Sequence, residues 1–246
     1  PSSSALSASR RRAAAVAMSA LATGWVMGRI TALATLGFLM SWWIVLAIVT
    51  DLWERIKPTG ITGGAGVLAR ARLLPRTMIG MMVAHLGVAA FAFGVSMVKT
   101  YEVERDLKMD VGDTTEIAGY VFTYRGVREI QGPNYGGAQG LIEVTRNGKA
   151  VSTMRPEKRV YRVQQNPMTE AAIDTGFTRD LYVSLGEPVG GNAWIVRVYY
   201  KPFVDWIWGG CLLMALGGGL AASDRRYRAT SRERANAPAV TAGVAS

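Results

Sequence analysis

Long uncharged apolar runs are the strongest pattern along the chain. Residues 30–49 carry no charge, residues 78–98 contain His85 as their one basic side chain, and residues 203–223 carry one charge, at Asp205. Each run has the ~20 residues that a helix needs to cross ~30 Å of hydrocarbon. A helix buried in a soluble core usually breaks its apolar run earlier and shows a polar face. The three runs therefore predict membrane spans.

A shorter uncharged run at residues 13–28 precedes the first of these spans. Arginines flank it at residues 10–12 and at Arg29. The run fits the apolar region of a signal peptide or a short first helix of a membrane hairpin. Because a second full span begins at once, we expect the hairpin, and so about four spans in all.

The segment between residues 99 and 202 shows the alternation of apolar and polar positions that is typical of strands, first at residues 120–125. Asn147-Gly148 separates two further runs, and this dipeptide is a strong β-hairpin signal. Other strands are expected at residues 158–163, 169–174, 180–185 and 194–200. Glycine and proline between most of these runs favour an antiparallel all-β barrel or sandwich.

The net charge of +10 lies outside this β-rich segment. Residues 100–202 carry 13 basic and 13 acidic side chains, whereas residues 1–29, 50–77 and 224–246 each carry a basic excess. Basic segments that flank membrane spans follow the positive-inside rule, by which they stay in the cytoplasm. A nucleic-acid binder would instead carry its positive charge on the folded domain. We therefore expect no nucleic acid as a partner. We expect a multi-pass protein of the bacterial inner membrane, with the β domain in the periplasm and the C-terminus in the cytoplasm.

The expected organisation has seven parts. They are a basic cytoplasmic N-terminus (1–12), two spans (13–50), a cytoplasmic loop (51–77), a span with His85 (78–98), a periplasmic β domain (99–202), a last span (203–223) and a disordered cytoplasmic tail (224–246). Glycines at residues 64–69 imitate a dinucleotide fingerprint, but that motif needs a preceding strand and a βαβ unit. We therefore expect this run to be loop.

His85 is the only histidine in the chain and lies within an expected span. An ionisable side chain at membrane depth points to a haem ligand, a proton relay or a hydrogen bond between helices. Small residues and one aromatic share one side of the same helix: Gly80, Ala84, Gly87, Phe91 and Gly94. They permit close approach of another helix or of a flat cofactor, and His85 lies one step round from them.

Other chemistry is limited by composition. The single cysteine, Cys211, lies in the last span, so the outer domain has no disulfide and no thiol, and zinc would need several Cys or His ligands. We expect no catalytic residue in this chain. An ion-pair cluster of Asp174, Arg179 and Asp180 is expected to be structural, and Trp206 and Trp208 are expected to form an interfacial aromatic belt.

Seven blocks in order resemble the C-terminal part of CcmF, the haem lyase component of cytochrome c maturation. They include Gly132-Pro-Asn-Tyr135 and span residues 80–89, 132–135, 156–161, 169–176, 179–188, 201–208 and 214–228. The likeness covers roughly residues 30–228. It implies a role in covalent haem attachment to apocytochrome c, together with CcmH, CcmI and a CcmE-like haem chaperone.

The resemblance also implies a b-type haem in the membrane with two axial histidines, of which His85 matches one. The second axial ligand is then expected from the N-terminal part of the same protein or from a partner chain. The tryptophan-rich haem-handling segment of the family, with its flanking histidines, has no match here, so we expect no haem lyase activity from this chain alone. The alternative is a cofactor-free, membrane-anchored β domain that acts as an assembly scaffold.

Overall fold

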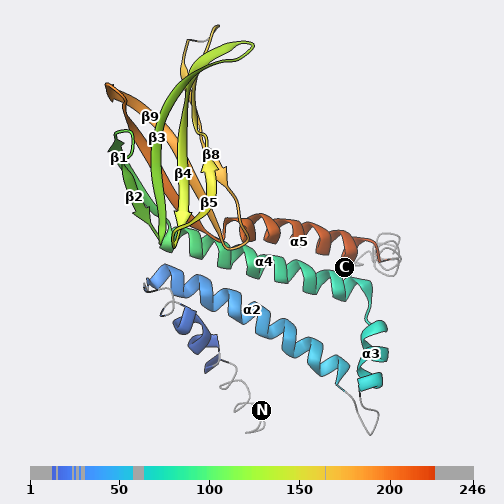
Figure 1. Ribbon diagram of the computed structural model, residues 1–246. Coiled ribbons are helices and arrows are strands. Elements are labelled where there is room, and N and C mark those ends of the chain that lie inside the picture. Colours follow the sequence, from blue (N-terminus) through green and yellow to red (C-terminus); the bar gives the residue numbers. More distant parts are fainter. Residues whose placement is uncertain are drawn as a thin grey trace, which may run out of the picture. The chain divides into compact units, whose positions relative to one another are not determined.

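The computed structural model describes residues 13–14, 16–23, 25, 28, 31–57, 64–163 and 165–224. The helices within them are α2 (Ala32–Ile56), α3 (Gly64–Arg72), α4 (Arg76–Tyr101) and α5 (Val204–Ala222) (Figure 1). Residues 16–23 are also helical.

Three of these helices, α2, α4 and α5, are long and apolar enough to cross a membrane. Large apolar side chains remain exposed on them, among them Leu33, Trp43, Leu212 and Leu216. Such a surface suits lipid, so the prediction of membrane helices is confirmed. The additional span expected at residues 13–28 lies partly outside the described residues and stays a prediction. The expected N-terminus (1–12) and most of the expected tail (225–246) also lie outside them.

The connector between α2 and α4 differs from the expected loop. Residues 64–72 form helix α3, so the loop prediction for residues 64–69 was wrong. Only the first turn contains glycine, while the following leucine, alanines and arginines favour helix and Arg70 and Arg72 suit the negative end of the helix dipole. Helix α2 also runs on to Ile56, where Arg55 pairs with Asp51 one turn earlier at 3.0 Å.

The β domain consists of two antiparallel sheets (Figure 1). One sheet has the order β1-β10-β9-β8, and the other β2-β3-β4-β6-β7 with β5 also paired to β4. The strands are β1 (Val103–Met109), β2 (Thr114–Ile117), β3 (Tyr120–Gln131), β4 (Tyr135–Arg146), β5 (Lys149–Met154), β6 (Glu157–Tyr161), β7 (Pro167–Glu170), β8 (Ala172–Asp174), β9 (Arg179–Gly190) and β10 (Ala193–Pro202). The expectation of an antiparallel β domain is confirmed.

The hairpin predicted at Asn147-Gly148 joins β4 to β5. Both turn residues have positive φ, 51° and 73°, which a two-residue hairpin turn of this type requires. In contrast, the single strand expected at residues 169–174 is two strands in different sheets, because β7 pairs with β6 and β8 pairs with β9. The sequence interpretation did not foresee β1 and β2.

Alternate side chains of both sheets meet in one apolar core. Its members include Phe122, Tyr124, Ile142, Val144, Leu181, Val183, Leu185, Val196 and Val198. None of these nine side chains is more than 1 % exposed. Burial on this scale, at roughly 25 cal/mol per Å² of apolar surface, is what stabilises a domain of this size that has no disulfide.

A β-bulge at Arg125 and Gly126 divides strand β3 into two halves. The pairing with β4 shifts there, and Gly126 adopts a φ of 112°. The extra residue keeps Val127 on the inner face that Tyr124 occupies, since a strand without the bulge would turn Val127 outward. The sheet face that packs against the core therefore continues along residues 127–131 of β3 and the paired residues 136–140 of β4.

Candidate functional site

Helix α4 carries the candidate site, and one face of it is closed by α5. The Cβ of any residue larger than glycine at position 80 would lie 2.5 Å from the Gly217 carbonyl oxygen, and at position 87 it would lie 2.6 Å from that of Gly210. Real Cβ atoms do not come so close to backbone, so only glycine fits at these contacts. The two helix backbones touch, which maximises van der Waals contact between helices in lipid.

The small-residue stripe that sequence analysis singled out is therefore a helix-packing surface. Gly94, its last glycine, faces the side chain and backbone of Ile207 in the same way, with 2.9 Å from a built Cβ to Ile207 Cγ1. The sequence analysis allowed two uses for this stripe, close approach of another helix or of a flat cofactor. The structure shows the first of them. Glycines recur on both helices at intervals of seven residues, which keeps them on one side.

A cluster at the start of α4 fastens the same two helices together. The Asp224 carboxylate accepts hydrogen bonds from the Thr77 backbone N–H at 3.2 Å and from the Thr77 hydroxyl at 2.6 Å. The carboxylate thus caps orphan donors in the first turn of α4 from a residue just after α5. Sequence reasoning missed this contact, because Asp224 there belonged to a charged tail with no assigned partner.

His85 lies on another side of α4 and its side chain is exposed. Its ring Nδ1 lies 2.8 Å from the Met81 carbonyl oxygen, one turn earlier. A carbonyl oxygen can only accept, so Nδ1 carries the hydrogen in this contact. In the neutral ring Nε2 then holds a free lone pair, which is the form of imidazole that binds a metal.

The arrangement offers a single donor atom to a ligand. Within the described part of the chain, no group of three or more His, Cys, Asp or Glu side chains is placed to hold a metal ion. Met82 is buried in the helix packing and Met81 is exposed. His85 can therefore serve as one ligand of a metal whose other ligands come from a cofactor or from another polypeptide.

The side chains expected to form an ion-pair cluster lie at the end of β8 and the start of β9. Arg179 pairs with Asp174 at 2.5 Å, as predicted, and also donates to the Tyr120 hydroxyl at 3.1 Å. Asp180 differs: it is 2 % exposed and accepts the Gly176 backbone N–H at 3.1 Å. Burial raises the pKa of the Asp180 carboxyl above its usual range.

Of the two belt tryptophans, Trp208 is exposed and Trp206 is held by the β domain. The Trp206 indole N–H donates to the Phe177 carbonyl oxygen at 3.1 Å, and its ring packs against Phe177 and Phe203 with centroids 5.5 Å away in each case. A buried or half-buried indole usually finds such a partner for its N–H. Trp206 therefore ties a loop of the β domain to the first turn of α5.

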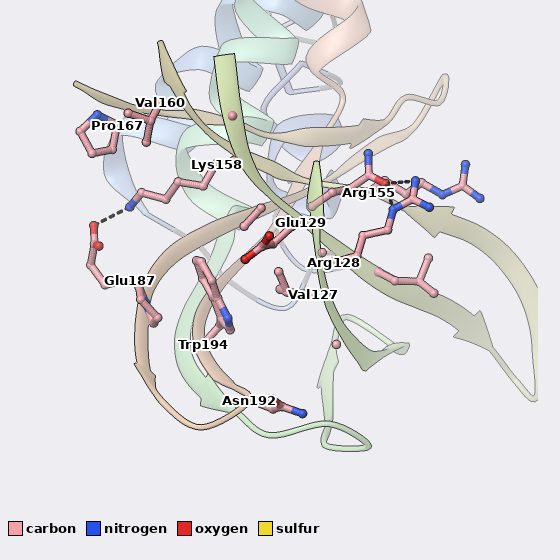
Figure 2. Close-up of a pocket in the computed structure, with 18 of the residues that line it drawn as sticks. Val127, Arg128, Glu129, Arg155, Lys158, Val160, Pro167, Glu187, Asn192 and Trp194 are labelled. Atoms are coloured by element: carbon pink, nitrogen blue, oxygen red, sulfur yellow. Dashed lines mark hydrogen bonds and ion pairs between the residues drawn. The ribbon is translucent and has the colours of Figure 1, made fainter. Parts of the chain in front are cut away.

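The β domain also contains a large cavity, shown in Figure 2. Its volume is about 1190 Å³, and its lining comes from β3, β4, β6 and the β9–β10 hairpin. Val127, Glu129, Lys158 and Trp194 surround it (Figure 2). Lys158 crosses from β6 towards β9, where its ammonium binds the Gly186 carbonyl oxygen at 2.9 Å and the Glu187 carboxylate at 2.5 Å. No feature of the sequence had suggested this cavity.

The comparisons with known proteins agree on one family. A family model described as "CcmF C-terminal beta-sandwich" matches residues 100–202. The "Cytochrome c-type biogenesis protein CcmF" of Pseudomonas aeruginosa is 52% identical over 197 residues, which are 80% of this chain and 29% of that protein. The protein of the same name from Pseudomonas fluorescens is 46% identical over 197 residues, with the same shares of 80% and 29%.

A solved structure of a "Cytochrome c Heme Lyase CcmF" matches with a TM-score of 0.67 and 21% identity, over 85% of this chain and 33% of that one. At that identity the likeness concerns the fold, which includes both the helices and the β domain. The chain spans about a third of the length of the relatives that it matches.

Proposed function

The chain belongs to the CcmF family of cytochrome c-type biogenesis proteins and corresponds to its C-terminal part, and on that premise we propose that it takes part in the covalent attachment of haem to apocytochrome c. Its own contributions are one axial ligand of a membrane b-type haem and a β domain outside the membrane. The identity of 52% to a CcmF protein is the observation that carries the proposal.

His85 fits the role of axial ligand in its chemistry. The bond from Nδ1–H to the Met81 carbonyl fixes the tautomer and the orientation of the ring, as second partners of metal-bound histidines commonly do. The ring is exposed on the helix, so a flat ligand can reach Nε2. A haem held there would supply an iron centre able to carry one electron.

A second axial ligand must come from elsewhere, because the chain has one histidine. We propose that the N-terminal part of the same protein or a partner chain supplies it. Attachment would further involve a CcmE-like haem chaperone, CcmH and CcmI as partners. On this proposal the isolated chain is inactive, because it holds half of the membrane haem site and no catalytic group of its own.

The proposed topology places the β domain in the periplasm and the C-terminus in the cytoplasm. The basic excess of the flanking segments supports this orientation, since the β domain itself is neutral. Single cysteines introduced at Asn147 and at Gly64, in a chain with Cys211 replaced by serine, test it in intact spheroplasts. An impermeant maleimide should label the first and spare the second, and the reverse pattern would overturn the orientation.

A cofactor-free scaffold is the second candidate, and one observation favours it. The small-residue face of α4 packs against α5, and the single hydrogen bond of the His85 ring stays within its own helix. On this view the spans only hold the β domain at the membrane.

Optical spectra of the purified chain separate the two candidates. The chain is prepared alone and co-expressed with the N-terminal part of the Pseudomonas aeruginosa relative. The first proposal predicts a reduced b-type spectrum on co-expression only. Absence of haem from both preparations, with the two parts shown to co-purify, would leave the scaffold.

A further inference from the structure

The loop between β8 and β9 carries an exposed aromatic side chain. Phe177 is 72% exposed, whereas the other aromatic side chains within the described residues of the β domain are buried or half-buried. A single exposed apolar side chain is common on protein surfaces and says nothing by itself. Its meaning depends on what holds it and on what lies beside it.

Two hydrogen bonds fasten this loop to the chain that leads into α5. The Phe203 backbone N–H donates to the Thr178 carbonyl oxygen at 3.1 Å, and the Trp206 indole N–H donates to the Phe177 carbonyl oxygen, also at 3.1 Å. Phe203 has a φ of 57°, a left-handed conformation that phenylalanine keeps only where its surroundings hold it. The loop is therefore fixed beside the first turn of α5.

Bonds within the loop fix its shape as well. The Asp180 carboxylate, which is 2% exposed, accepts the Gly176 backbone N–H at 3.1 Å. The Arg179 backbone N–H donates to the Gly176 carbonyl oxygen at 3.2 Å. Because the backbone on both sides of Phe177 is held in this way, the ring stays exposed without having to be ordered by a partner, and little conformational entropy is lost when a surface covers it.

The neighbours of Phe177 indicate which surface that is. Its ring packs against Trp206, with the centroids 5.5 Å apart. Trp206 is the third residue of α5, a helix long and apolar enough to cross a membrane, so it lies within about 5 Å of the beginning of that span. Tryptophan at such a position marks the boundary between lipid and water. The exposed carboxylate of Asp205 in the same turn puts this level among the headgroups, because charge is costly in hydrocarbon.

A lysine and two tyrosines near the same end of β10 agree with this level. Lys201 lies two residues before Phe203, and its ammonium lies 5.2 Å from the ring centroid of Tyr182 and 5.3 Å from that of Tyr199. Aromatic side chains with a polar tip, together with lysine, are typical of the zone where a membrane protein meets the headgroups.

The small size of the apolar tip favours lipid over a protein partner. A specific protein interface covers ~800 Å² on each side. Besides Phe177, the loop holds only Thr175, Gly176 and Thr178, and the adjacent Trp206 is half-buried. One ring and part of another are too little for such an interface, but they suffice to enter the headgroup region, which demands no complementary shape.

We propose that the β8–β9 loop is a membrane contact in addition to the spans, in which Phe177 inserts into the headgroup region of the leaflet where α5 begins. The β domain is then held at the bilayer by this loop as well as by its connections to α4 and α5. This inference goes beyond the proposed function. Its test involves neither haem nor the side of the membrane on which the domain lies, so either proposal can fail alone.

Fluorescence quenching by labelled lipid tests the insertion. In a chain with Cys211 replaced by serine, Thr178→Cys carries a nitrobenzoxadiazole label next to an intact Phe177, and Lys108→Cys carries it at a control position. Lys108 pairs with Ile195, eight residues before Phe203, and so lies about 26 Å along the strands from the beginning of α5. The chains are placed in phosphatidylcholine nanodiscs that contain lipid with a nitroxide near the top of the acyl chain.

The label at position 178 should be quenched about threefold more strongly than the label at position 108, as expected for a group within ~10 Å of the acyl boundary. Equal quenching at the two positions would overturn the proposal. Absence of quenching at position 178 would also overturn it, and would leave Phe177 in water and open to a protein partner.

Substitutions of Phe177 separate insertion from mere nearness to α5. In the chain labelled at position 178, Phe177→Ser should lower the quenching about twofold or more, while Phe177→Leu should keep most of it, because leucine also partitions into the interface. Val189→Ser is the matched control, since it removes an exposed apolar side chain from the other end of β9. Unchanged quenching in Phe177→Ser, or the same loss in Phe177→Leu and Val189→Ser, would contradict insertion of the ring.

Discussion

Two sides of helix α4 lie in the same apolar run but differ in what they contact. The glycine side is closed by α5, to the point that no Cβ fits at positions 80 and 87. The side with His85 is open, and the ring bonds only to its own helix through Met81. Both sides are uncharged and both lie in one apolar run, so hydropathy alone does not distinguish them.

The difference separates packing from binding in this helix. Close packing needs small side chains on both partners, and α4 and α5 each provide glycines where they touch. Binding of a ligand needs a donor atom that packing leaves free, and His85 has one in Nε2. The closed side is therefore expected to govern the stability of the helix pair, and the open side to govern haem content.

The largest expected effect is on the closed side. Gly217→Leu forces a side chain into the backbone of α4 near Gly80 and Ala84, and should destabilise the helix pair by about 3 kcal/mol, as severe overpacking does. Gly218→Leu is the matched control, because a Cβ there has nothing within 4 Å. Thermal unfolding in detergent measures both. Similar melting temperatures for the two variants would mean that α4 and α5 do not touch as described.

A smaller effect is expected where Asp224 caps α4. Asp224→Ala removes the acceptor for both Thr77 donors and should cost about 1 kcal/mol, the usual value of a lost helix cap. Asp224→Asn keeps an acceptor oxygen and should cost less. The same unfolding assay serves, and an alanine variant no less stable than the asparagine variant would contradict the capping role.

The smallest effect on stability is expected on the open side. His85→Ala in the isolated chain should change the free energy of unfolding by no more than about 0.5 kcal/mol, because the ring is exposed and alanine favours helix. Leu86→Ala, also exposed, is the control. A large loss of stability confined to His85→Ala would mean that the ring is a packing residue and not a free ligand.

Features that depend on one local pattern were predictable from the sequence. Uncharged runs locate α2, α4 and α5 because crossing a membrane requires their length. Asn147-Gly148 locates a hairpin because both residues tolerate positive φ. His85 stood out because an ionisable side chain within such a run is unusual.

Features that depend on distant partners were not predictable. The short strands β7 and β8 look like one segment at residues 169–174, and only their pairing with β6 and β9 divides them. The cavity depends on the bulge at Gly126, which decides the side of the sheet on which Val127 lies. Likewise, nothing in the composition of the tail points to the contact between Asp224 and Thr77. Thr77 lies at the start of α4, and Asp224 lies just after the end of α5.

Chemical rescue of the ligand tests the central claim most directly. His85→Gly in the co-expressed complex removes the imidazole, and Leu86→Gly places the same flexible residue one position away. We predict that His85→Gly loses the b-type spectrum, that added imidazole restores it, and that Leu86→Gly keeps it throughout. A His85→Gly complex with an unchanged spectrum before any imidazole is added would contradict the assignment of His85 as an axial ligand of haem.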